Sequence, residues 1–214
     1  MTSAALFGVA IGAALVGFAR KVVGHGVTAA HEAGHAVVAV LLGRELTSLK
    51  VRPNRSGETW SKGAGSRLGL AVLAMAGYPA PMVVGLAVAW AIRHGRAREA
   101  LAGALVAVVL SVPFWKGLWT VIVGVALAVA LGAAVYYRGR FAEAMAGGIV
   151  AIGTLGGLFD IFEIAGSKVK RNDSSDVGKV AALFFLPVVV AKAGLALFGI
   201  GLAALTAFVA LRPG

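Results

Sequence analysis

The chain has 214 residues, of which 59% are hydrophobic and 14% are charged, and its mean hydropathy is +0.90. Soluble domains carry about 25% charged residues, so this composition excludes a soluble globular protein and predicts a chain surrounded mostly by lipid. The net charge of +11 comes from short basic clusters between apolar runs, which are typical of the ends of membrane spans and argue against nucleic-acid binding.

Apolar runs divide the chain into about six or seven predicted spans, since each crossing needs about 20 residues. In chain order they cover residues 3–18, 22–42, 68–92, 100–112, 118–137 and 142–165, and a last stretch, 176–211, has room for one span and an extra helical piece. Prolines within 76–81 and at position 187 are expected to break their helices. We therefore expect an all-α, multi-pass protein of a bacterial cell membrane, forming one polytopic domain over residues 1–214. Its membrane orientation and oligomeric state stay open.

A polar stretch, residues 43–66, follows the second predicted span. Residues 47–51 alternate loosely between apolar and polar, 52–57 contain the turn formers proline, asparagine and glycine, and 58–61 can return as a second strand. This pattern predicts a small β-hairpin directly after the second span. A hairpin around residues 47–60 has an edge strand that can hold an extended substrate, or it is an ordinary surface hairpin.

A cluster of ionisable residues, His31-Glu32-Ala33-Gly34-His35, lies inside the second predicted span. Helical residues four apart differ by about 40° in direction and about 6 Å along the axis, so both histidines can bind one metal ion. Glu32 lies beside that ion and can take a proton from a water that the metal activates. A lone helical histidine is usually structural, but charged residues in hydrocarbon cost about 2.5–3.5 kcal/mol each and mark functional sites. We interpret His31 and His35 as zinc ligands and Glu32 as the catalytic base.

A catalytic zinc site needs a third protein ligand, and a chain with no cysteine and nine carboxylates offers few choices. Asp160 is the first choice, because it lies in an otherwise apolar run where it needs a cation; its alternative role is an ion pair with Lys168. Glu163, three residues further on, is a candidate partner of a ligand. Asp176 is the alternative third ligand, and its other role is a first-turn acid that complements a helix dipole.

Two glycines in the same run, Gly153 and Gly157, have the spacing that lets helices approach closely. The motif helix has small residues of its own at positions 26, 30, 33 and 34. This complementarity favours packing of the two helices against each other, which would bring Asp160 towards the histidines.

Several short motifs occur in the order known from one family. They are HEAGH at 31–35, SGET at 56–59, AGY at 76–78, DIFE at 160–163 and SDV at 175–177. Together they resemble the M50B-like peptidases, which are membrane zinc metalloproteases of the site-2-protease type. The resemblance implies a helical membrane fold, bound zinc and cleavage of a peptide bond within or near the bilayer. In site-2 proteases the third ligand is an aspartate in an L-D-G motif, whereas here Ile161 follows Asp160.

The sequence therefore predicts an intramembrane zinc endopeptidase whose partners are membrane lipid and a transmembrane protein substrate. Two other classes stay open. A metal-ion transporter would use the histidines and Asp160 as an ion pathway, and a non-catalytic membrane scaffold would retain the motif for structural reasons.

Overall fold

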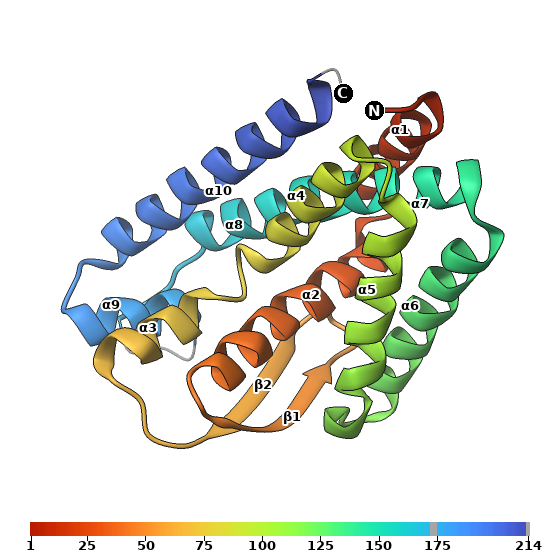
Figure 1. Cartoon of the computed structure of the whole chain (residues 1–214). Coiled ribbons are helices and arrows are strands. Elements are labelled where there is room, and N and C mark those ends of the chain that lie inside the picture. The colour runs from red at the N-terminus through yellow and green to blue at the C-terminus, as the bar shows by residue number, and fades with distance from the viewer. Residues whose placement is uncertain (172–174, 213–214) are drawn as a thin grey trace.

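The computed structural model describes residues 1–171 and 175–212 and is mostly helical (Figure 1). The helices are α1 (Ser3–Phe18), α2 (Arg20–Leu41), α3 (Arg67–Met75), α4 (Ala80–Arg93), α5 (Ala97–Ser111), α6 (Leu118–Tyr137), α7 (Gly139–Ala151), α8 (Gly157–Gly166), α9 (Asp176–Phe184) and α10 (Val188–Leu211). A short 3-10 helix, η1 (Val112–Phe114), follows α5, and a π-helical turn, η2 (Ile152–Gly156), joins α7 to α8. The predicted helical fold with one small hairpin is confirmed; residues 172–174 of the loop before α9 lie outside the described part.

Four helical segments of the described residues are long and apolar enough to cross a membrane, namely Ala97–Phe114, Leu118–Tyr137, Gly139–Gly166 and Val188–Leu211. Two bent pairs raise this number to six if each pair is one span: α1 with α2, bent by 107°, and α3 with α4, bent by 69°. The count is close to the six or seven spans predicted. The first two predicted spans correspond to α1 and α2, which are the arms of one bent pair. The 16 residues of α1 are about 24 Å long, less than the core of about 30 Å.

The break between α3 and α4 occurs where the prolines predicted it. Helix α3 ends at Met75 and α4 begins at Ala80, with Pro79 directly before it and Pro81 in its first turn. Proline lacks an amide donor and its ring clashes with the preceding turn, so a continuous helix is excluded here. The chain therefore turns over the middle of α2, beside His31 and His35.

The glycines of the α7–α8 segment do allow close packing. A Cβ atom on Gly153 would lie 2.4 Å from the carbonyl oxygen of Pro81, and one on Gly157 would lie 2.6 Å from Cγ of Met82. Both contacts are with α4, so the expectation that these two glycines pack on the motif helix is wrong. The glycine between them, Gly156, is the one that contacts α2.

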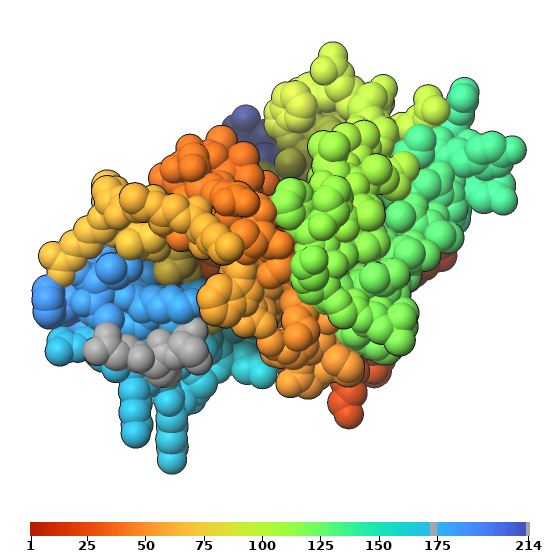
Figure 2. All heavy atoms as spheres, turned by 90° about the horizontal axis from the view of Figure 1, so that it is seen from below, coloured from red at the N-terminus to blue at the C-terminus, as the bar shows by residue number. Residues whose placement is uncertain are grey.

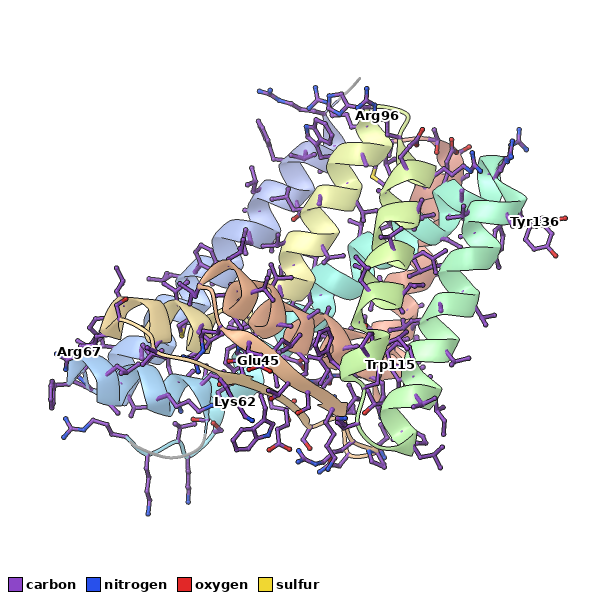
Figure 3. The ribbon with its side chains drawn as sticks, turned by 60° about the horizontal axis from the view of Figure 1, so that its bottom comes forward. Glu45, Lys62, Arg67, Arg96, Trp115 and Tyr136 are labelled. Atoms are coloured by element: carbon purple, nitrogen blue, oxygen red, sulfur yellow. The ribbon has the colours of Figure 1, made fainter. Side chains whose placement is uncertain are left out.

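Strands β1 (Glu45–Val51) and β2 (Gly57–Lys62) form the predicted antiparallel hairpin. Figure 3 shows Glu45 and Lys62 opposite each other at its open end, and Arg96 and Tyr136 at the other end of the helical bundle. The outer side of β1 is held by the chain before α6, since the amide of Lys116 donates to the carbonyl of Leu49 at 2.9 Å. Among the described strands β2 pairs with β1 alone, and its residues 57 to 61 line a cavity that α2 and α9 also line.

A buried apolar cluster fixes the start of α9. Val177 and Ala181 of α9 are completely buried and pack with Ile161 of α8 and Leu195 of α10. Burial of such side chains is the main stabilising contribution in a packed core. Because Val177 is anchored, the residue before it, Asp176, has a fixed position beside α2.

Candidate metal centre

Three side chains from two distant parts of the chain meet at one point between α2 and α9. Nε2 of His31 lies 3.1 Å from Nε2 of His35, and Oδ2 of Asp176 lies 3.4 Å from the first nitrogen and 3.2 Å from the second. In a tetrahedral zinc site with bonds of 2.0–2.1 Å, neighbouring ligand atoms are about 3.3 Å apart. The three atoms are thus spaced like three corners of a tetrahedron around a single ion.

The hydrogen bond of His35 shows which ring nitrogen is available for a metal. Its Nδ1 lies 2.7 Å from the carbonyl oxygen of Leu73. A carbonyl only accepts, so Nδ1 carries a proton, and Nε2 is the ring nitrogen left to face a metal. Leu73 lies in the last turn of α3, where its carbonyl accepts from the amide of Ala76 at 3.3 Å and has a second lone pair for His35. The proline break after α3 therefore orients a histidine on α2.

Asp176 is the first residue of α9, and the rest of its environment also fixes it. The hydroxyl of Ser175 caps the helix by accepting from the amide of Gly178 at 3.1 Å. Lys179 donates to Oδ1 of Asp176 at 3.0 Å, which leaves Oδ2 facing the histidines. Burial alone would raise the pKa of Asp176, but the adjacent imidazoles outweigh burial and hold the pKa well below its usual range. Asp176 is therefore both the first-turn acid and the carboxylate beside the histidines.

The first-choice third ligand, Asp160, lines the same cavity but is paired with Arg20 instead of the histidines. Nη2 of Arg20 donates to Oδ1 of Asp160 at 3.3 Å and to Oε2 of Glu163 at 2.6 Å. The expectation that Asp160 needs a cation is met, but by an arginine at the start of α2 rather than by Lys168 or a metal. Glu163 binds Arg20 as well and contacts neither histidine.

Glu32 is buried, with 6% of its surface exposed, and strand β2 covers its carboxylate. The hydroxyl of Thr59 donates to Oε2 of Glu32 at 2.6 Å. A Cβ atom on Gly57, two residues earlier on the same face of β2, would lie 2.1 Å from Oε1. Glu32 therefore fits beneath the strand only because position 57 is a glycine.

A cavity of about 1240 Å³ connects these groups. It is lined by Glu32, both histidines and Asp176, and by the β2 residues from 57 to 61. Figure 2 shows the hairpin and α9 next to each other on the face that is viewed from below. Strand β2, the carboxylate of Glu32 and the three candidate ligands therefore face one cavity.

Gly77 leaves room beside the candidate ligands. A Cβ atom there would lie 2.3 Å from Nε2 of His31 and 2.5 Å from Nε2 of His35. These are nearly the distances at which zinc binds imidazole nitrogen. The residue that follows, Tyr78, packs the edge of its ring against His31 with the ring centres 4.8 Å apart. The donor set, its spacing and the free space thus fit one zinc ion held by His31, His35 and Asp176.

Sequence reasoning assigned no role to four residues that shape this site. They are Arg20, Gly57, Thr59 and Gly77. Three of them lie in the short motifs SGET and AGY. The glycines of these motifs, Gly57 and Gly77, are a weak sequence signal that the backbone closely approaches another part of the chain. Nothing in the sequence indicates that Arg20 meets Asp160, because that contact depends on how α2 and α8 pack.

The fold and site define a multi-helix membrane protein with a candidate centre of two histidines and one carboxylate. The Peptidase M50B-like family matches residues 4–207, which is nearly the whole chain, so the protein belongs to this family. It is therefore an integral, multi-pass membrane protein of the site-2-protease type of metallopeptidase. No curated protein and no solved structure matches the chain.

Proposed function

We propose that the protein is an intramembrane zinc endopeptidase, with zinc held by His31, His35 and Asp176. The observation that carries the proposal is the spacing of the three ligand atoms, 3.1 to 3.4 Å apart, next to the space that Gly77 leaves open. A structural cluster of two imidazoles and a carboxylate has no need for this gap. When bound, zinc supplies Lewis-acid catalysis, polarising the scissile carbonyl and lowering the pKa of an attacking water.

Glu32 has the position of a general base in this reaction. Its carboxylate lies next to the histidines in sequence and lines the same cavity. It accepts a proton from the attacking water and passes it to the nitrogen of the leaving amine as the carbon–nitrogen bond breaks. The carboxylate ends the cycle unprotonated, ready for another turnover.

Strand β2 supports an extended substrate in this proposal. A transmembrane helix hides its peptide bonds, so a substrate has to unwind locally in a polar cavity before it is cut. The free edge of β2 lines the cavity beside Glu32, and an added strand there would satisfy the peptide groups exposed by unwinding. The proposed substrate is therefore the span of another membrane protein.

The test compares the wild-type chain with Glu32→Gln in lipid vesicles. The probes are single-span peptides whose spans carry glycine or proline, which makes them easy to unwind. We expect cleavage by the wild type, a loss of about 100- to 10,000-fold in Glu32→Gln, and one zinc per chain in both. Full cleavage by the zinc-loaded variant would overturn the role of Glu32. Zinc flux across the vesicles without any cleavage would favour the transporter instead.

The absence of cysteine allows a direct test of the β2 edge. Trp60→Cys in the Glu32→Gln background can be paired with cysteines placed one at a time along the peptide. If the peptide binds as an extended segment, crosslinks should concentrate within two or three adjacent peptide positions. They should form only where the span of the peptide can unwind. Equal crosslinking all along the peptide would contradict strand addition.

A further inference from the structure

Strand β2 makes a contact with α2 that the proposed reaction does not by itself require. The hydroxyl of Thr59 lies 2.6 Å from Oε2 of Glu32 and 3.1 Å from the backbone carbonyl of the same residue. A hydroxyl has one proton to donate, and the shorter distance to a charged acceptor marks the carboxylate as its partner. A single side chain thus attaches the hairpin to the carboxylate of Glu32 and also lies close to the backbone of that residue.

The two oxygens of Glu32 have different surroundings because of β2. Oε2 is held by Thr59, whereas Oε1 faces Gly57, where a side chain would collide with it. Residues 57 and 59 point to the same face of a strand because side chains alternate with a period of two. Thr59 therefore holds one oxygen by a hydrogen bond, whereas Oε1 lies against Gly57, whose lack of a side chain makes room for it.

We propose that Thr59 is a positioning residue that orients Glu32 so that Oε1 is the oxygen that exchanges protons with water and the leaving amine. This inference rests on the proposed function, because it assigns an orientation to the general base named there. Thr59 acts through Glu32 and is not itself a group that touches the reacting atoms. Strand β2 consequently has two roles, since its edge holds the substrate and its inner face aligns the base.

The two halves of the threonine side chain allow a sharp test. Valine keeps the shape of threonine and removes the hydroxyl, whereas serine keeps the hydroxyl and removes the methyl group. If Thr59 orients Glu32 through its hydroxyl, Thr59→Ser retains most activity and Thr59→Val loses about tenfold or more. If Thr59 only packs the hairpin against α2, the order is reversed. The two hypotheses therefore predict opposite rankings of the same pair of variants.

The measurement is cleavage of the peptide that the wild type cuts, with kcat and KM determined separately in lipid vesicles. We expect Thr59→Val to lower kcat while KM and the zinc content stay at wild-type values, since neither the β2 edge nor the ligands change. Thr206→Val is the matched control, because it removes a buried hydroxyl that donates within α10 to the carbonyl of Leu202 at 2.8 Å. The control is expected to cleave like the wild type.

A combination with Glu32→Gln separates failure of this inference from failure of the proposed function. In the Glu32→Gln background, Thr59→Val should cause no further loss, because its effect passes through the carboxylate. Two results would show that the positioning role is wrong while Glu32 is still the general base. In the first, Glu32→Gln is inactive and Thr59→Val cleaves like the wild type. In the second, Thr59→Ser is as impaired as Thr59→Val. If Glu32→Gln itself is fully active, the proposed function fails first.

Discussion

Gly77 and His31 lie so close together that a single methyl group on the glycine would come within 2.3 Å of the imidazole Nε2. Gly77 belongs to the break between α3 and α4, and His31 belongs to the middle of α2. The bend in the chain thus brings a residue without a side chain to the place where a metal ligand needs free space.

Gly77→Ala is expected to reduce zinc binding, because its methyl group occupies space beside both histidine nitrogens. Zinc content after purification in limiting metal should fall well below one ion per chain, and cleavage should fall with it. Gly17→Ala is a suitable control, since a Cβ atom at Gly17 meets nothing within 4 Å. Zinc retained at one per chain in Gly77→Ala would contradict the placement of the ion.

Gly57→Ala is expected to reduce cleavage without reducing zinc binding. Its methyl group would come within 2.1 Å of Oε1 of Glu32, so either the carboxylate or β2 has to move. Neither is a ligand of the metal, and zinc should remain at one per chain. Cleavage should fall by about tenfold or more, and peptide-cleavage assays together with metal analysis check both halves of this prediction.

Asp176→Asn and Asp160→Asn distinguish the two aspartates. Loss of the charged ligand in Asp176→Asn is expected to weaken zinc affinity by more than the 10- to 100-fold that is typical of changes around a ligand. Asp160→Asn removes a partner of Arg20 and should leave zinc affinity within about tenfold of the wild type. Competition with a chelator measures both affinities, and the reverse ranking would make Asp160 the ligand after all.

Arg20→Gln is expected to destabilise the packing of α2 against α8, because it leaves Asp160 and Glu163 without their shared cation. Removing one partner of a fully buried pair costs about 3–5 kcal/mol. The side chains of Arg20 and Asp160 are 32% and 33% exposed, so a smaller loss of about 1–2 kcal/mol is expected.

Thermal unfolding in detergent checks the Arg20 prediction. The loss should be smaller when Asp160→Asn is already present, since part of the uncompensated charge is then absent. Lys21→Gln, which removes the same charge from the next position on α2, serves as the control. An equal loss in both backgrounds would show that Arg20 and Asp160 are not energetically coupled.

The sequence by itself determined the properties that depend on local pattern. Apolar runs predicted the helices. The hairpin that was predicted after the second span is also present. Both predictions succeed because composition and alternation act over a few residues. The prolines near Pro79 and Pro81 predicted the break between α3 and α4 for the same reason. The spacing of His31 and His35 placed both on one helix face, since helical geometry relates residues four apart without any tertiary contact.

Only the tertiary structure decided which carboxylate joins the histidines. Asp160 and Asp176 both had a reason to seek a cation, and the choice depended on Arg20 reaching one and on buried Val177 fixing the other. The positions of Gly57, Thr59 and Gly77 against α2 were equally beyond a reading of local patterns. Such contacts join residues that are 25 or more positions apart, and they are set by the packing of whole helices rather than by the neighbouring residues in the chain.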